Sequence, residues 1–199
     1  KVAMITGASR GLGRAMAAAL GAEGVRLSLC ARGAEALDAT AAELKSAGHQ
    51  VIAEAADVND AAAMERWTAN TIKAHGGIDI LINNAGAARV GANSQLDDAG
   101  WLAAFELNFF AAVRLSRLCA DAMANRGGGS IINISSIYGR EAGGPISYNA
   151  SKAAMISFTK GLARELAKQA VRVNSIAPGS IIYPGGGWEA RFKQNPEFE

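Results

Sequence analysis

Short apolar runs alternate along this chain with longer segments whose apolar residues recur at helical spacing. The short runs predict buried strands and the longer segments predict helices. The strands are predicted at 1–6, 25–30, 50–55, 78–82, 130–136 and 171–176. The helices are predicted at 14–22, 35–47, 61–74 and 153–169, with one long helix or two within 96–123 and a loop at 87–95. This alternation is typical of an α/β, Rossmann-like fold, a doubly wound parallel sheet with helices on both faces in three αβα layers.

Composition narrows the class of protein. The 199 residues suit one domain over 1–199, since neither repeats nor low-complexity linkers divide them. A net charge of +2 gives no basic field for nucleic acid, and the apolar runs are too short for a membrane span. Cys30 and Cys119 are predicted as buried free thiols of a reducing cytoplasm. His49 and His75 are predicted on the surface, and the sequence offers no metal-ligand spacing.

The first predicted turn has the context of a phosphate-binding loop. Gly7, Gly11 and Gly13 follow the first strand and open the first helix, in the spacing G-x-x-x-G-x-G. Glycines let backbone amides approach a pyrophosphate, and a helix N-terminus favours its negative charge. This spacing departs from the G-x-G-x-x-G dinucleotide fingerprint. The alternative is an ordinary glycine turn between a strand and a helix.

The end of the second predicted strand bears on the choice of cofactor. In an NAD site, an Asp or Glu at this point holds the ribose 2′-hydroxyl. This chain has Cys30-Ala31-Arg32 there and no carboxylate. Arg32, together with Arg10 of the glycine loop, suits a 2′-phosphate. The sequence therefore favours NADP(H) over NAD(H), and the alternative is that both arginines are merely solvated.

Polar residues follow several other strands, at the sheet edge where open α/β sheets bind ligands. Asp57 and Val58 follow the third strand, and Asn83-Asn84-Ala85-Gly86 follow the fourth. Ser135 and Ser136 end the fifth. Asn108 stands among bulky apolar residues, so its amide needs partners and is either structural or part of a site.

Tyr148 and Lys152 are the candidate chemical groups. Residues four apart lie on one face of a helix, so the two side chains are predicted to be neighbours. A phenol titrates near pH 10, and an adjacent ammonium is expected to lower that pKa. The pair is then able to take a proton from an alcohol or give one to a ketone. The alternative is two unrelated surface side chains.

Taken together, these segments resemble the short-chain dehydrogenase/reductase family, in particular its 3-oxoacyl-[acyl-carrier-protein] reductase-like members. The resemblance rests on the residues of five motifs, which occur in the family's order and close to its spacing: Thr6 to Gly13, Asn83 to Gly86, Asn133 to Ser136, Tyr148-x-x-x-Lys152 and Ala177-Pro178-Gly179.

The resemblance implies hydride transfer between a nicotinamide and a ketone or secondary alcohol, with Tyr148 as general acid or base. Lys152 would lower its pKa and hold the nicotinamide ribose, Ser136 would bind the substrate oxygen, and Asn108 would position a water that connects Lys152 to solvent. The implied cofactor-binding residues are Gly7, Ser9, Arg10, Gly11, Leu12, Gly13, Arg32, Asp57, Val58, Asn84, Ala85, Gly86, Tyr148, Lys152, Pro178, Gly179 and Ile181.

Some implications stay open. Ser135 fits the family's distance to the tyrosine, whereas Ser136 fits its distance to the following glycine and is favoured. The chain is expected to stop short of the family's C-terminal helix and last strand, and a full-length form is expected to be a homo-oligomer, a tetramer or dimer. The substrate segment 181–198 is predicted to carry a mobile lid at Gly185 to Trp188. Rival readings are a sugar or polyol dehydrogenase and a non-catalytic dinucleotide-binding protein.

Overall fold

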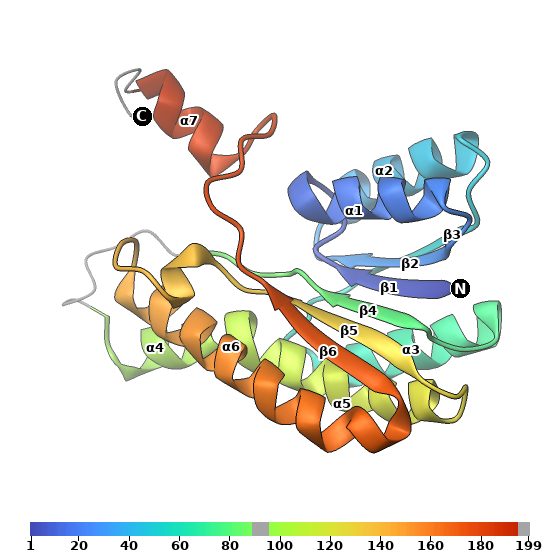
Figure 1. The fold of residues 1–199 in the computed structure, drawn as a ribbon. Coiled ribbons are helices and arrows are strands. Elements are labelled where there is room, and N and C mark those ends of the chain that lie inside the picture. Colours follow the sequence, from blue (N-terminus) through green and yellow to red (C-terminus); the bar gives the residue numbers. More distant parts are fainter. Residues whose placement is uncertain (89–95, 195–199) are drawn as a thin grey trace.

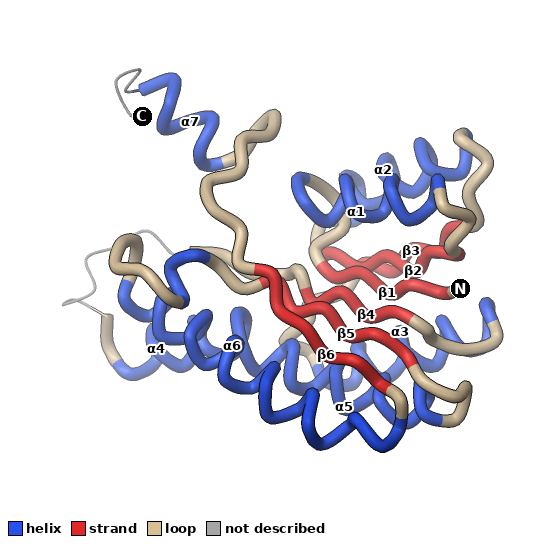
Figure 2. The backbone as a smooth tube through the Cα atoms, in the orientation of Figure 1, coloured by secondary structure: helices blue, strands red, loops and turns tan. Residues whose placement is uncertain are grey.

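A computed structural model describes residues 1–88 and 96–194. Six parallel strands form one sheet in the order β3-β2-β1-β4-β5-β6 (Figure 2). Their bounds are Val2–Thr6 (β1), Arg26–Ala31 (β2), Val51–Ala55 (β3), Ile80–Asn83 (β4), Gly129–Ile134 (β5) and Val171–Ile176 (β6). All of these strand pairings are parallel, which confirms the predicted parallel sheet. Each strand is separated from the next by a helical crossover, as parallel pairing requires.

Helices cover both faces of this sheet (Figure 1). On one face lie α1 (Gly11–Ala22) and α2 (Ala34–Ser46). On the other lie α3 (Ala61–His75), α4 (Asp98–Phe105), α5 (Ala111–Ala124) and α6 (Ile146–Leu166). Short elements complete the described chain: η2 (Glu106–Phe110), η3 (Ile137–Gly139), η4 (Ala167–Gln169) and α7 (Gly187–Gln194). The three-layer αβα architecture is therefore as predicted.

One predicted bound is wrong, and at a second segment the structure selects one of the two predicted alternatives. The helix predicted at 153–169 begins earlier, at Ile146, because Pro145 at its N-cap presets the backbone for a helix start. The segment 96–123 contains α4 and α5 joined by η2, a π-helix that inserts extra backbone at Asn108. Most of the loop predicted at 87–95, and the end of the segment 181–198, lie outside the described residues.

The core consists of two apolar layers, one on each face of the sheet. Leu37 of α2 packs with the β2 residues Leu27 and Leu29 on one face. Trp67 of α3 and Leu115 of α5 belong to the layer on the other face. All five are nearly or fully buried, so the sheet is fixed from both sides and its carboxyl edge is a rigid platform. None of the helices in the described part of the chain combines the length and apolar character that crossing a bilayer requires.

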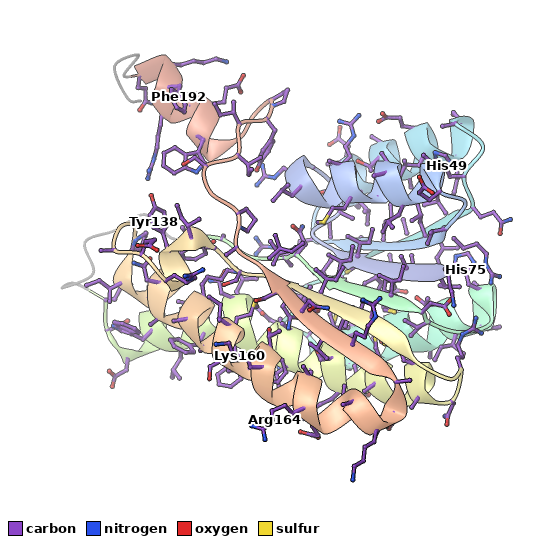
Figure 3. The ribbon with its side chains drawn as sticks, in the orientation of Figure 1. His49, His75, Tyr138, Lys160, Arg164 and Phe192 are labelled. Carbon is purple, nitrogen blue, oxygen red and sulfur yellow. The ribbon has the colours of Figure 1, made fainter. Side chains whose placement is uncertain are left out.

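The two histidines were predicted on the surface, and for His75 this is wrong (Figure 3). His75 is buried, and its Nε2 lies 3.2 Å from the carbonyl oxygen of Leu27. The imidazole therefore satisfies a backbone group beside the sheet. His49 is half-buried, with its ring against Gly21 of α1.

The strand order places a switch point between β1 and β4. From β1 the chain winds to β2 and β3 in one direction, and from β4 to β5 and β6 in the other. The loops that leave β1 and β4 therefore run in opposite directions, and a crevice opens between them at the carboxyl ends of these strands. The sequence-predicted polar residues gather at this edge.

Candidate active site

The loop between β1 and α1 is shaped for close approach of a ligand. Gly7 and Gly11 have φ angles of +63° and +55°, which L side chains rarely adopt. A Cβ on Gly13 would lie 2.3 Å from the carbonyl oxygen of Gly7. α1 starts directly after Arg10, whose side chain makes no capping hydrogen bond among the described residues. The first amides of α1 thus suit an anion, and this loop fits the pyrophosphate of a dinucleotide.

The loop after β4 is tied to the glycine loop by reciprocal hydrogen bonds. The amide nitrogen of the Asn84 side chain donates to the carbonyl oxygens of Thr6, at 2.9 Å, and Gly7, at 3.2 Å. In return, the Thr6 hydroxyl oxygen accepts from the backbone amides of Asn84 and Ala85, each at 2.9 Å. This clamp spans the switch point and sets the spacing between the two loops. Asn84 is therefore largely occupied in holding the loops together.

Charged residues stand at the β2 and β3 end of the crevice. Arg10 and Arg32 both line it, and both are exposed. A guanidinium nitrogen of Arg32 lies 4.0 Å from a carboxylate oxygen of Asp57. Because both groups are solvated, this ion pair is weak and leaves Arg32 able to meet another anion. Val58 lines the crevice beside them.

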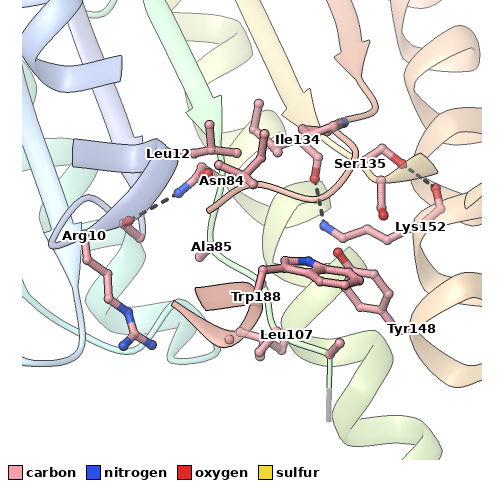
Figure 4. A pocket seen from close by; sticks show the side chains of 18 of the residues that line it. Arg10, Leu12, Asn84, Ala85, Leu107, Ile134, Ser135, Tyr148, Lys152 and Trp188 are labelled. Carbon is pink, nitrogen blue, oxygen red and sulfur yellow. Dashed lines mark hydrogen bonds between the residues drawn. The ribbon is translucent and has the colours of Figure 1, made fainter. Parts of the chain in front are cut away.

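Tyr148 and Lys152 project from the first turns of α6 into the same crevice (Figure 4). The Lys152 ammonium nitrogen lies 5.7 Å from the centre of the Tyr148 ring. It donates a 2.7 Å hydrogen bond to the carbonyl oxygen of Ile134, at the end of β5. Ser136, which follows β5, lines the crevice too and lies near enough to the Tyr148 phenol to lower its pKa. The hydroxyl, the phenol and the ammonium therefore meet where β5 and α6 converge.

Burial controls the protonation of this group. It raises the pKa of the Tyr148 phenol above its ordinary value of 10.0, and the hydrogen bond from Ser136 lowers it by less. The predicted lowering of this pKa by Lys152 is therefore wrong, because burial dominates and the net shift is upward. Burial also lowers the pKa of Lys152 to about 8, because the low-dielectric surroundings disfavour the ammonium.

The two candidate serines have different partners. Ser135 donates its hydroxyl hydrogen to the carbonyl oxygen of Lys152 at 2.9 Å, which fastens β5 to α6. Ser136 accepts from the backbone amide of Tyr138 at 3.2 Å, and its hydroxyl lowers the pKa of the Tyr148 phenol. Ser135 therefore fastens the scaffold, and Ser136 lies beside the Tyr148 phenol. This geometry favours Ser136, as the spacing to Gly139 suggested.

Asn108 lies behind the crevice wall and is 1% exposed. Its side-chain amide donates to the carbonyl oxygens of Ala87, at 3.1 Å, and Ala104, at 3.0 Å, and its oxygen accepts from the Ala87 amide at 3.0 Å. Gly86 separates it from Lys152: a Cβ there would lie 2.8 Å from the Asn108 oxygen and 3.3 Å from the Lys152 nitrogen. Asn108 lies in the π-helix η2, whose wider turn changes the helical register so that this amide is buried. Such π-helical insertions are frequent at functional sites.

The crevice is a cavity of about 1100 Å³. That is slightly above the roughly 300–1,000 Å³ of ordinary ligand pockets, which suits an elongated ligand. Most predicted site residues line it: Gly7, Ser9, Arg10, Leu12, Arg32, Val58, Asn84, Ala85, Gly86, Ser136, Tyr148, Lys152, Pro178, Gly179 and Ile181. Four do not: Gly11 lies under the Tyr183 ring, Gly13 and Asn108 are buried, and Asp57 faces solvent and Asn59.

Other residues of the site were not predicted. Leu107, Tyr138, Tyr183 and Arg191 line the cavity, and no spacing rule pointed to them. The predicted lid segment also has a defined shape. Tyr183 accepts a 2.9 Å hydrogen bond from the Gly186 amide, which closes a β-turn, and α7 follows with Trp188 in its first turn. A Pro-Gly pair after the last strand is the signal that predicts such a turn.

Known proteins share this arrangement. The family model for short chain dehydrogenases matches residues 1–184. The chain is 37% identical over 183 residues to a 3-oxoacyl-[acyl-carrier-protein] reductase of Synechocystis sp., which covers 91% of this chain and 74% of that protein. The structure of actinorhodin polyketide ketoreductase with NADPH superimposes with a TM-score of 0.91 at 35% identity, over 100% of this chain and 77% of that one.

A second solved structure is equally similar. It is the L-sorbose reductase of Gluconobacter frateurii, complexed with NADPH and L-sorbose, with a TM-score of 0.90 at 36% identity. That comparison covers 98% of this chain and 80% of the other. The sequence motifs, the sheet order and these likenesses agree. The chain belongs to the short-chain dehydrogenase/reductase family, which binds NAD(P)H and carries out oxidation and reduction at hydroxyl and carbonyl groups.

Proposed function

We propose that this protein is an NADP(H)-dependent carbonyl reductase of the 3-oxoacyl reductase type, with Tyr148 as general acid. The observation that carries the proposal is that Ser136, the Tyr148 phenol and the Lys152 ammonium line the same cavity as the glycine loop, with the ammonium nitrogen 5.7 Å from the Tyr148 ring centre. A bound reduced nicotinamide supplies the hydride. The chain's own residues supply the binding, the orientation and the proton.

The proton comes from a phenol that burial keeps neutral. Tyr148 donates it to the carbonyl oxygen as negative charge develops there, and Ser136 turns its one hydroxyl hydrogen from the phenol to the same oxygen. Lys152 holds a positive charge near the phenol and stabilises the phenolate that remains. Asn108 holds the loop at Ala87 and positions the water that returns a proton towards Lys152. In alcohol oxidation the same groups act in reverse.

The preference for NADP(H) rests on charge. β2 ends at Ala31 with no carboxylate, and Arg32 follows it on the cavity wall. The described residues that line the cavity include Arg10, Arg32, Arg191 and Lys152, and no Asp or Glu. This surplus of positive charge suits a phosphorylated cofactor. A homo-oligomer in the cytoplasm is also proposed, from the family resemblance alone.

Two other functions compete with this one. The first alternative is a sugar or polyol dehydrogenase, and the similarity of this chain to the structure of L-sorbose reductase supports it. Against it, the wall of the cavity that contains Tyr148 includes Ile137, Pro145 and Leu107, whose side chains offer no hydrogen bonds to a polyol. A non-catalytic dinucleotide-binding protein would not need the Ser136, Tyr148 and Lys152 arrangement.

The test compares Tyr148→Phe with the wild type on a panel of ketones and alcohols, followed by NADPH absorbance. Phe keeps the ring and its burial but removes the proton, so turnover should fall by about 10²–10⁴-fold while NADPH affinity is retained. Tyr138→Phe is the matched control, because Tyr138 also lines the cavity. Turnover that survives Tyr148→Phe contradicts the assignment. NADPH binding without turnover of any compound in the wild type favours the non-catalytic alternative.

A further inference from the structure

α7 is held over the cavity by contacts at both ends of the turn before it. The Tyr183 ring packs on Gly11 of the glycine loop, so that a Cβ there would be 2.9 Å from the ring. The Gly185 amide donates a 2.7 Å hydrogen bond to the carboxylate of Glu189, which also pairs with Lys193 at 3.1 Å. These contacts fix which face of α7 meets the cavity. That face carries Trp188 and Arg191.

Arg191 is a guanidinium that the proposed chemistry does not use. It lies over the Trp188 ring, 5.0 Å from the ring centre, and both side chains line the cavity. Within the described chain it has no ion pair, whereas Lys193 two residues on is paired with Glu189. The lining residues described include no carboxylate that would neutralise it. A guanidinium placed at a cavity wall without an acid is equipped to bind an anion from the ligand.

The surroundings of Arg191 indicate what else the ligand carries. Trp188 offers an aromatic face, and Leu107, Ile137 and Pro145 line the same cavity. Figure 4 shows the indole projecting from α7 into the pocket that contains Tyr148. A guanidinium stacked on an aromatic ring loses little conformational entropy when it binds an anion, because the ring already restricts its side chain. The pocket thus combines an apolar wall with one cationic anchor.

We propose that Arg191 binds an anionic group of the substrate, so that the enzyme prefers ketones with an apolar body and a carboxylate or phosphate over neutral ones. This inference rests on the proposed reductase function. Arg10 and Arg32 stand at the other end of the cavity and are assigned to the cofactor. The cofactor's own pyrophosphate is the rival anion for Arg191, and the experiment separates the two sources.

The experiment compares 4-oxo-4-phenylbutanoate with its methyl ester, a pair that differs in one negative charge. The wild type should show a higher kcat/KM for the acid, and Arg191→Gln should reduce this acid-to-ester ratio by about 10–100-fold, the range for a charge-assisted hydrogen bond. Arg191→Lys should restore part of it. Lys45→Gln is the charge control, because it removes one positive charge from an exposed position of α2 outside the cavity lining and leaves the contacts of α7 intact.

Calorimetric titration provides readouts that do not depend on turnover. Binding of the acid to the NADP⁺-loaded protein should weaken in Arg191→Gln, with the dissociation constant of NADPH unchanged. Such binding in a protein that turns over neither compound supports this inference and removes the reductase function instead. An unchanged acid-to-ester ratio, or acid binding that is independent of Arg191, overturns the inference while leaving the reductase intact. A loss of NADPH affinity at an unchanged ratio assigns Arg191 to the cofactor and also overturns it.

Discussion

The Tyr183 ring lies directly against Gly11, although one residue follows the last strand and the other begins the first helix. A Cβ on Gly11 would be 2.9 Å from two ring carbons, and the backbone there has a φ of +55°. Gly11→Ala should therefore be destabilising for two reasons, backbone strain and displacement of the ring. The strain alone costs about 1 kcal/mol.

Urea unfolding of four variants separates these two effects. Gly24→Ala is the control for strain, since Gly24 has a φ of +74° with nothing within 4 Å of its Cβ position. Gly11→Ala should lose about 1 kcal/mol more than Gly24→Ala and should weaken NADPH binding. Adding Tyr183→Ala to Gly11→Ala should recover the steric part of the loss relative to Tyr183→Ala alone. Additive losses would show that the ring and Gly11 do not interact.

Gly86 keeps Asn108 and Lys152 apart. A methyl group at this position would be 2.8 Å from the Asn108 oxygen and 3.3 Å from the Lys152 nitrogen, so both groups must shift. Because a displacement of about 1 Å can reduce catalysis by about 10²-fold, Gly86→Ala should lower kcat by roughly that factor. Gly33→Ala is the control, since Gly33 lines the same cavity with open space around it. A normal kcat in Gly86→Ala would show that the site tolerates the shift.

The hydrogen bond from Ser136 should be visible in pH–rate profiles. It lowers the pKa of the Tyr148 phenol, so Ser136→Ala raises that pKa further. Alcohol oxidation needs the phenolate and rises with pH, and ketone reduction needs the phenol and falls at high pH. In Ser136→Ala both limbs should move to higher pH. Ser135→Ala, which removes only the bond to the Lys152 carbonyl, should leave the limbs in place.

The charge that selects the cofactor is tested at Arg32. Its ion pair with Asp57 is long and solvated, so the guanidinium is available for a 2′-phosphate. Arg32→Ala should weaken NADP⁺ binding by about tenfold and leave NAD⁺ binding nearly unchanged. Arg14→Ala is a suitable control, because Arg14 pairs with Glu43 and does not line the cavity. Equal affinities for the two cofactors in the wild type would contradict the preference.

The parts of this site that sequence patterns predict are those built from local rules. Apolar runs mark the strands, and parallel strands bring their carboxyl ends to one edge, so Gly7, Asn84 and Ser136 were expected to gather there. Helical spacing likewise placed Lys152 beside Tyr148. The motif order carried the family assignment, because five short motifs in sequence are far more specific than any one of them.

What the patterns missed depends on tertiary contacts. The sign of the Tyr148 pKa shift follows from burial, which no spacing reveals. The π-helix at Asn108 changes the helical register without changing the apolar pattern. Tyr183 reaches Gly11 only because a turn after β6 folds back across the sheet edge. His75 was predicted on the surface, but its ring is buried and its Nε2 lies 3.2 Å from the carbonyl oxygen of Leu27 in the neighbouring strand β2.

At the opposite edge of the sheet, Asp79 joins three segments of the chain. Its carboxylate accepts a 2.8 Å hydrogen bond from the Val2 amide, and nitrogens of Arg126 and Lys1 lie 3.4 Å and 3.5 Å away. Burial alone would raise the Asp79 pKa, but the Val2 amide, Arg126 and Lys1 together lower it below its ordinary value of 3.8. The folded protein therefore binds this proton less tightly than the unfolded chain does.

Stability from Asp79 is fully present above pH 3.8 and is lost as the pH falls through the lower folded-state pKa. Asp79→Asn should lose about 2 kcal/mol of unfolding free energy at pH 7, the range for hydrogen bonds to a charged group. Its deficit relative to the wild type should shrink below about pH 4, as the wild-type carboxylate is protonated.

Asp38→Asn, at an exposed position of α2, controls for the change of charge. Chemical unfolding at pH 7, 5 and 3 measures the difference, and a deficit that is constant over this range would mean that the Asp79 carboxylate does not stabilise the fold through its charge.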